Sequence, residues 1–180
     1  ALMHCGPKTI AAGLLHDTLE DTNITNVENM FRECKSLTTL PSFMFNGLNI
    51  SIADSAFYNC IVLKSLPDDF LNGCLQFNVQ YNFTSPFEKS GLEQIGSYVL
   101  RNYQGTSLAN VFSNIKTLKT IDSKMFNETA IKNIADTFRG CSALTQVPEL
   151  WTNPQFTSFD DCFYGATMAS NYASIPEAWK

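Results

Sequence analysis

The chain has 180 residues, a net charge of −5, 44% hydrophobic residues and 16% charged residues. This composition is typical of a folded protein with a sizeable core and excludes a disordered chain. An acidic chain with no block of Lys or Arg offers little to nucleic acid, and no apolar run approaches the length of a membrane span. We therefore expect neither nucleic-acid binding nor direct membrane insertion.

The N-terminal stretch "AAGLLHDTLEDT" carries His16-Asp17 and Glu20-Asp21. It resembles the short motif of stringent-response nucleotide hydrolases, which implies an HD-type metal-dependent phosphohydrolase. A hydrolytic metal site, however, needs several ligands that converge from different elements. The only other histidine is His4, and a repeat begins directly downstream. We therefore expect residues 1–30 to be a degenerate first repeat, with an HD-type fragment as the lesser alternative.

A 26-residue repeat occupies most of the chain. "MFRECKSLTTLPSFMFNGLN" begins at Met30, and "AFYNCIVLKSLPDDFLNGCL" begins at Ala56 with aromatic, cysteine, leucine, Leu-Pro and Asn-Gly positions in the same slots. The pattern returns in "VFSNIKTLKTIDSKMFN" and "TFRGCSALTQVPELW", and a looser terminal repeat covers 163–180. The sequence predicts one array of about six repeats over residues 1–180.

The segment 74–111 fits this period least well. Continuing the period predicts an aromatic slot at Phe83 and an aliphatic slot at Leu92, with Pro86 in the cysteine slot. The spacing then slips before Phe112. We expect an irregular repeat with an insertion in this segment.

The repeated slots also predict the core, because one short unit has too few apolar residues to bury itself and must share a core with its neighbours. The cysteine slot elsewhere holds Ile115 and Ala166, so buried thiols are expected there. Parallel side chains in stacked units make poor disulfides, and no C-x-x-C pair indicates zinc. The predicted core comprises Phe31, Cys34, Leu37, Leu40, Phe57, Cys60, Leu63, Leu66, Phe112, Leu118, Ile121, Phe138, Cys141, Leu144 and Val147.

Local patterns predict the elements of each unit. The segment around each "TLP" or "SLP" is expected to be a short strand that ends at its proline, and each "NG" indicates a turn. "NVENMFREC" and "NIADTFRGC" have helical spacing and predict one or two helical turns. The predicted fold is an α/β repeat, a leucine-rich-repeat-like solenoid with short parallel strands and short helical turns.

The unit F-x-x-C-x-x-L-x-x-L-P resembles the BspA-like leucine-rich repeats, the 26-residue repeat family of bacterial surface proteins. "MFRECKSLTTLP", "AFYNCIVLKSLP" and "TFRGCSALTQVP" carry the resemblance, which covers most of residues 21–180. It departs at 74–111 and at Ala166. The resemblance implies a solenoid displayed on a bacterial cell or a phage virion and used for attachment, and hence an extracellular or cell-surface location.

Polar residues between the inward leucines are expected to line one face, and repeat proteins commonly bind partners through such faces. Exposed loop aromatics, which often anchor contacts, are the alternative, and Tyr103 belongs to this group in the sequence. The candidate binding residues are Thr39, Lys64, Ser65, Lys119, Thr120, Thr145, Gln146, Tyr58, Tyr164 and Trp151.

The sequence contains no pattern that indicates a catalytic or a metal-binding site. Two histidines near the N-terminus provide no Ser-His or Cys-His pair, and Gly-rich phosphate loops are absent from the sequence. Asp68-Asp69 and Asp160-Asp161 are interpreted as solvated turns, since a calcium site needs more oxygen ligands in one loop. We predict no catalytic residue, no metal and no cofactor.

We therefore expect a non-enzymatic binding or adhesion module that recognises a protein or a glycan on a cell surface, as part of a longer display protein. The alternative is a structural spacer or assembly element of a larger cell-surface or phage particle.

Overall fold

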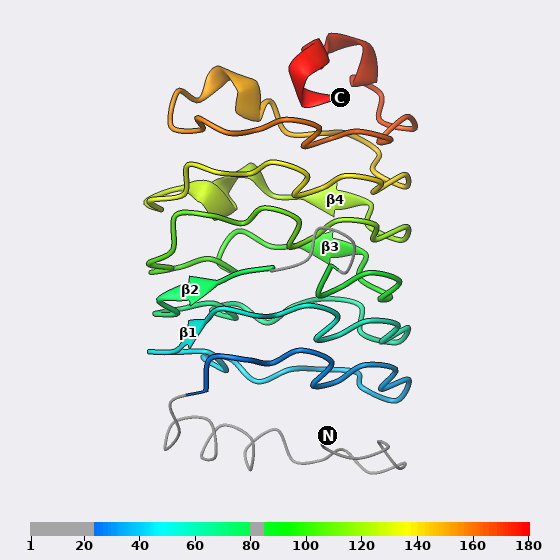
Figure 1. Ribbon diagram of the computed structural model, residues 1–180. Coiled ribbons are helices and arrows are strands. Elements are labelled where there is room, and N and C mark those ends of the chain that lie inside the picture. Colours follow the sequence, from blue (N-terminus) through cyan, green and yellow to red (C-terminus); the bar gives the residue numbers. More distant parts are fainter. Residues whose placement is uncertain (1–23, 80–84) are drawn as a thin grey trace.

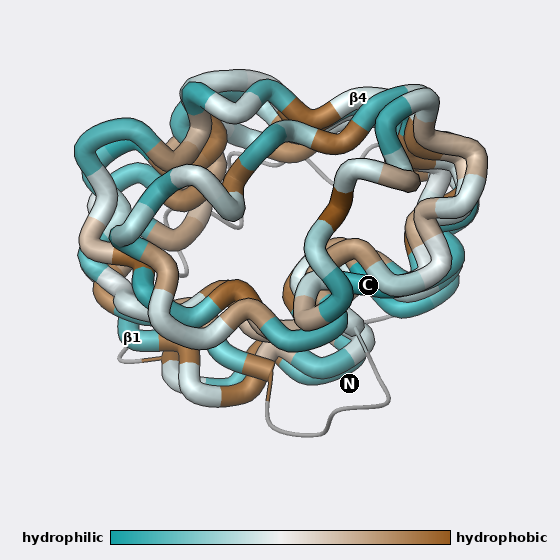
Figure 2. The backbone as a smooth tube through the Cα atoms, turned by 90° about the horizontal axis from the view of Figure 1, so that it is seen from above, coloured by the Kyte–Doolittle hydropathy of each residue, from teal (hydrophilic) through white to brown (hydrophobic). Residues whose placement is uncertain are grey.

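The computed structural model describes residues 24–79 and 85–180. Over these residues the chain winds into coils that lie one above the other, and the C-terminus lies at one end of the stack (Figure 1). Seen along the stack, the coils lie over one another around a common interior (Figure 2). The repeating sequence therefore builds a repeating backbone.

Neighbouring coils run parallel and pair at the period of the repeat. Asn26 bridges to Ile52, and Ser107 bridges to Asn133, which is 26 residues further along in both cases. Two short strand pairs fall on different sides of the stack (Figure 1). They are β1 (Asn49–Ile50) with β2 (Gln76–Phe77), and β3 (Gln94–Ile95) with β4 (Thr120–Ile121).

The described residues contain no α-helix, so the helical turns predicted in "NVENMFREC" and "NIADTFRGC" are wrong. Asn29 and Glu33 have φ of 55° and 61°, which interrupt a right-handed helix. The N–H groups of Asn29 and Phe31 donate to carbonyls of the next coil at 3.0 and 2.7 Å rather than along their own segment. Helical structure is limited to the 3-10 turns η1 (Ser123–Phe126), η2 (Leu150–Thr152), η3 (Tyr172–Ser174) and η4 (Glu177–Trp179).

One aromatic ring from each coil joins a continuous stack. The ring of Phe57 lies 5.2 Å from that of Phe31 and 4.9 Å from that of Phe87, and the planes differ by 7° and 4°. Each such pair contributes about 0.5–1.5 kcal/mol beyond the burial of its area. This aromatic ladder joins coil to coil through the whole described stack. It continues through Phe112, Phe138, Phe163 and Trp179.

The irregular repeat enters the ladder through Phe87. The prediction placed Phe83 in this slot, and that residue lies outside the described residues. Phe87 fills the slot because its ring stacks between those of Phe57 and Phe112. The extra residues of this repeat therefore precede the aromatic slot instead of following it.

The cysteine slot of the irregular repeat shifts with the aromatic slot. Ser90 lies three residues after Phe87, as Cys60 lies three residues after Phe57, and Ser90 is buried. Pro86, which the sequence predicted there, instead accepts a hydrogen bond from the N–H of Phe57 at 2.7 Å. The prediction of Pro86 in the cysteine slot is therefore wrong.

Leu37 and Ile121 depart from the predicted core, because each is only partly buried. Leu37 belongs to the first described coil, which has a described neighbour on one side only. Ile121 borders an open groove. The other predicted core side chains are buried: Phe31, Cys34, Leu40, Phe57, Cys60, Leu63, Leu66, Phe112, Leu118, Phe138, Cys141, Leu144 and Val147.

The last residues of the chain cover the final coil. Trp179 is buried, and its ring stacks 4.5 Å from Phe159 and 6.3 Å from Phe163. The N–H of Phe163 donates to the carbonyl of Trp179 at 2.7 Å, and the N–H of Asp161 donates to that of Ala178 at 3.2 Å. These hydrogen bonds match those of the preceding coil, in which the N–H groups of Asp136 and Phe138 donate to the carbonyls of Asp160 and Cys162.

Candidate functional site

One side of the stack presents a row of polar side chains, here called the polar face. It follows the segments on either side of β3 and β4, between the buried aliphatic slots. All seven of its predicted binding residues are exposed there: Thr39, Lys64, Ser65, Lys119, Thr120, Thr145 and Gln146.

Two lysines of the polar face are joined by a glutamate that the sequence reasoning missed. Lys64 Nζ lies 3.1 Å from one carboxylate oxygen of Glu93, and Lys119 Nζ lies 2.7 Å from the other. These contacts with Lys119 and Lys64 lower the pKa of Glu93 below its ordinary value. A signal was present, since Glu93 follows Leu92 as Lys64 follows Leu63 and Lys119 follows Leu118. The lysines thus form a charged row instead of two separate cations.

Hydroxyl groups of the polar face bond to the backbone of the preceding coil. Thr145 Oγ1 donates to the carbonyl of Lys119 at 3.2 Å, and Thr117 Oγ1 donates to that of Leu92 at 2.7 Å. The end of the polar face opens into a groove of about 440 Å³ between segments 120–123 and 145–149. Thr120, Thr145 and Gln146 line it. The face therefore combines a rigid scaffold with one open depression.

The predicted loop aromatics occupy different environments. Tyr164 is 50% exposed, and Tyr58 is half-buried with the Arg32 guanidinium 4.2 Å from its ring centre. Trp151 is partly buried, with its ring centre 6.3 Å from that of Trp179, so less of this side chain is open to a partner than of Tyr164.

Tyr103 is a core residue. It is 3% exposed, and its hydroxyl accepts from the N–H of Phe77 at 3.1 Å and donates to the carbonyl of Ser107 at 3.0 Å. Burial raises the pKa of this hydroxyl well above its ordinary value. The interpretation of Tyr103 as an exposed loop aromatic is therefore wrong, because the hydroxyl replaces a backbone partner between coils.

Sequence reasoning missed a second exposed aromatic site. Tyr98 is 50% exposed, and the guanidinium carbon of Arg101 lies 4.4 Å from its ring centre. Both line a groove of about 350 Å³ together with Lys124, Met125, Asn127 and Glu128 of the next coil. The sequence carries a weak signal for this site. The position 26 residues after Tyr98 holds Lys124, so the slot is not restricted to apolar residues as a core slot would be.

One aspartate of each acidic pair forms an ion pair, whereas Asp68 and Asp160 are exposed as expected of solvated turns. Asp69 adopts a φ of 65° and forms an ion pair with Arg101 at 3.3 Å. Asp161 adopts a φ of 54° and forms an ion pair with Arg139. In both cases a cation from a neighbouring coil holds the carboxylate, which corrects the sequence interpretation.

Two cysteines of the repeat slot, Cys60 and Cys141, are free and buried. Each thiol donates to the carbonyl of the ladder phenylalanine one coil back, Phe31 at 3.1 Å and Phe112 at 3.2 Å. Burial raises the pKa of both thiols to about 12. They are core groups with little thiolate character.

Cys34 departs from the predicted pattern of buried thiols, because it forms a disulfide. The prediction considered only stacked neighbours in the same slot, and Cys60 is indeed free. Cys74 and Cys162, which the sequence did not assign, are also free and buried.

The described residues contain no group of three or more His, Cys, Asp or Glu side chains placed to hold a metal ion. In the same part of the chain, no helix is long and apolar enough to cross a membrane. The His16-Asp17 motif lies outside the described residues.

The coils, the aromatic ladder and the polar face define a repeat protein. Residues 76–176 match the family described as "Mycoplasma protein of unknown function, DUF285", a match that spans more than half of the chain, and the chain belongs to this family.

Solved structures include a chain that is similar over most of this one. A leucine-rich repeat protein from Eubacterium ventriosum is 20% identical, with 73% of this chain and 41% of that chain covered and a TM-score of 0.34. This chain therefore spans less than half of the length of that protein. No curated protein matches the sequence. The resemblance to BspA-like repeats stays a prediction beside the DUF285 assignment.

Proposed function

We propose that this chain is a leucine-rich-repeat-like solenoid that acts as a non-catalytic binding or adhesion module, displayed at a cell surface or on a virion. Its partner is a protein or a glycan. The observation that carries the proposal is that each repeat has buried apolar positions and exposed polar positions on different sides. Apolar slots build the aromatic ladder and core, and the polar face presents exposed side chains on rigid, hydrogen-bonded coils.

Rigidity supports this function for a physical reason. A partner that binds to a preformed surface loses less free energy to the ordering of side chains and loops. The Lys64–Glu93–Lys119 row and the threonine hydroxyls bonded across coils hold the polar face in one arrangement. Stacked repeats also place equivalent side chains at regular intervals, which suits an extended partner.

Attachment to cells tests the proposal. The folded chain would be labelled and applied to intact bacterial and epithelial cells, with the heat-unfolded chain as control. Selective attachment of the folded chain to one cell type is expected. Lys119→Gln should weaken attachment several-fold, because it removes a cation from the polar face.

Lys132→Gln is the matched control. Lys132 is exposed and adjoins the Ser107–Asn133 bridge. This bridge is separate from the β3–β4 pairing that the polar face follows. The Lys132→Gln substitution removes one positive charge, as Lys119→Gln does, and should leave attachment unchanged. Absence of attachment to every cell type would overturn the binding function and favour the structural spacer.

A further inference from the structure

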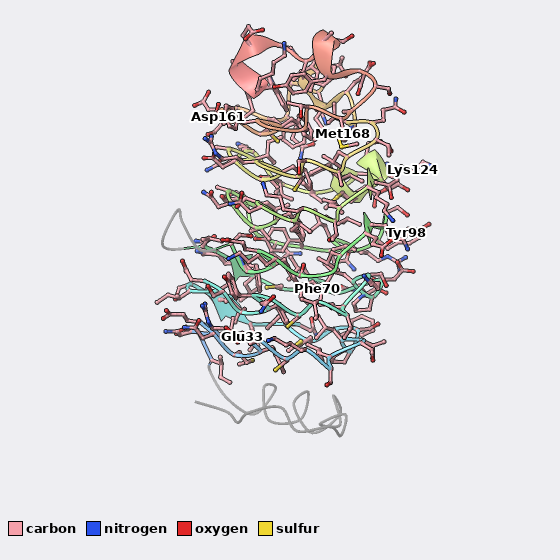
Figure 3. The ribbon with its side chains drawn as sticks, turned by 90° about the vertical axis from the view of Figure 1, so that its right-hand side faces the viewer. Glu33, Phe70, Tyr98, Lys124, Asp161 and Met168 are labelled. Atoms are coloured by element: carbon pink, nitrogen blue, oxygen red, sulfur yellow. The ribbon has the colours of Figure 1, made fainter. Side chains whose placement is uncertain are left out.

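We propose that the groove beside Tyr98 binds a sugar carboxylate, so that an acidic saccharide is the ligand class recognised by this module. The inference rests on the proposed binding function. Tyr98 and Arg101 line the groove from one coil, and Lys124 and Glu128 line it from the next. Figure 3 shows Tyr98 and Lys124 at the same edge of the stack, in neighbouring coils, with both labels beside side chains that point outward.

The groove has the size and the aromatic platform that a saccharide needs. Its volume of about 350 Å³ lies within the range of small-molecule sites. Tyr98 is 50% exposed, although Arg101 lies against its ring at 4.4 Å. The apolar C–H face of a pyranose ring packs on an exposed aromatic ring of this kind, as other amphipathic groups do.

The backbone holds the platform in place. The carbonyl of Tyr98 accepts hydrogen bonds from the N–H groups of Asp69 and Arg101, each at 3.1 Å. Met125, which is 1% exposed, contributes to the lining from the neighbouring coil. Little ordering is therefore needed when a ligand arrives.

The charges of the groove select a carboxylate. Arg101 contacts Asp69 through Nε at 3.3 Å, and its terminal nitrogens donate no hydrogen bond to any described residue. Lys124 forms no ion pair within residues 24–79 and 85–180. Because guanidinium groups bind carboxylates through paired hydrogen bonds, the free edge of Arg101 suits a sugar acid. Glu128 and the amide of Asn127 provide an acceptor and further hydrogen-bonding groups for ring hydroxyls.

A second Tyr–Arg pair in the molecule lacks these properties and serves as a comparison. Tyr164 is also 50% exposed, and the Arg139 guanidinium lies 4.2 Å from its ring centre. Arg139, however, is ion-paired with both Asp136 and Asp161. Asp161 lies at the opposite edge of the stack from Tyr98 (Figure 3). The aromatic–cation pair is the same in both places, but two carboxylates balance the charge of Arg139, whereas Arg101 is paired with Asp69 alone and has Lys124 beside it in the groove.

Matched disaccharides test the proposal on the full chain. Cellobiouronic acid and cellobiose differ by a carboxylate in place of a hydroxymethyl group. Each would be titrated into the isotopically labelled protein, and dissociation constants would be measured from NMR shifts. The acid is expected to bind about tenfold more tightly than the neutral sugar, since the charge-assisted contacts are absent for the latter.

Variants assign the binding to this groove. Tyr98→Ala should abolish binding, and Lys124→Gln should weaken binding of the acid several-fold but leave binding of the neutral sugar unchanged, since Arg101 still contacts the carboxylate. Tyr164→Ala is the control and should change nothing, because it removes an equally exposed ring from a Tyr–Arg pair outside the groove. Unfolding curves of each variant verify that these exposed substitutions leave the fold intact.

Three outcomes would overturn the inference: equal affinity for the two disaccharides, undiminished binding by Tyr98→Ala, and binding of an acidic peptide without binding of either sugar. The cell-attachment assay separates this failure from failure of the proposed function. If the Tyr98→Ala and Lys124→Gln variants attach to cells as well as the unmodified chain does, only the saccharide site is refuted. Absence of attachment by the unmodified chain would overturn the binding function itself.

Discussion

The rings of Phe57 and Phe87 stack at 4.9 Å with planes 4° apart, although the two residues are separated by more than one repeat length of sequence. The core thus keeps its geometry across the irregular repeat. The extra residues of the irregular repeat lie before Phe87 in the sequence. The ring of Phe87 therefore still stacks on that of Phe112, at 5.5 Å. Stacking of side chains, and not spacing in the sequence, sets which phenylalanine occupies the slot.

Removal of a central ring should therefore be costly. Phe87→Ala is expected to lower the free energy of unfolding by about 3–5 kcal/mol, because it leaves a cavity between two stacked neighbours. Urea unfolding followed by circular dichroism measures this loss. Met168→Ala, at a side chain that is 74% exposed, should change the stability by less than about 0.5 kcal/mol. Similar losses for both variants would contradict the role of the ladder.

Ser90 has a buried hydroxyl group and occupies the repeat position that Cys60 and Cys141 occupy in other coils. Its Oγ has no hydrogen-bond partner in the described structure. Ser90→Ala is expected to stabilise the protein by about 1 kcal/mol, since it removes an unsatisfied polar group from the core. Denaturant midpoints measure the change.

Ser85→Ala provides the matched control for that experiment. Ser85 is equally buried, but its Oγ donates to the carbonyl of Val111 at 3.0 Å. The same substitution should here destabilise the protein by about 1 kcal/mol. If both substitutions shift the midpoint in the same direction, satisfaction of the hydroxyl is not what distinguishes the two sites.

Gly91 lies in a connection that is one residue shorter than its counterpart, since Leu92 is two residues after Ser90 whereas Leu63 is three residues after Cys60. A Cβ at this position would collide with the carbonyl oxygen of Ile61 in the preceding coil, which is backbone and has little room to move. Gly91→Ala should therefore destabilise the protein by about 2 kcal/mol through overpacking. Gly47→Ala is a useful contrast, because no atom lies near its Cβ and only its φ of +72° opposes the change. A thermal scan in which Gly91→Ala unfolds no earlier than the parent would refute the close approach.

The buried thiols predict a loss of stability at alkaline pH. Burial raises the pKa of Cys141 from 9.0 to about 12, so the folded state holds its proton while the unfolded state releases it. The resulting stability is complete below pH 9 and is lost as the pH rises toward 12. At pH 10.5 this group should cost about 2 kcal/mol relative to pH 8.

Comparison with Cys141→Ala isolates that contribution from other alkaline titrations. The variant should start less stable at pH 8 but should lose less stability between pH 8 and pH 10.5 than the parent. Ser142→Ala, at the neighbouring half-buried position, should follow the parent curve. Parallel curves for the parent and Cys141→Ala would show that the thiol does not titrate differently in the two states.

The period of the chain was predictable because the core imposes it. A coil that stacks on its neighbour needs an apolar group at each equivalent position, so Phe57, Cys60 and Leu63 recur in the sequence and are buried in the structure. Helical turns were not predictable in the same way. Asn29 and Glu33 have left-handed backbone conformations, and hydrogen bonds to the next coil replace those along a helix. Local spacing cannot reveal that competition.

By itself, the sequence determined the repeat and the inward slots, since each depends on residues that recur at one interval. The tertiary structure decided what depends on the approach of one coil to the next. It selected Phe87 for the ladder, placed Glu93 between Lys64 and Lys119, and brought Lys124 beside Tyr98. These relationships join residues of different coils, and an insertion changes which residues meet. The physical reason is that stacking and ion pairing act through space, whereas a period records only distance along the chain.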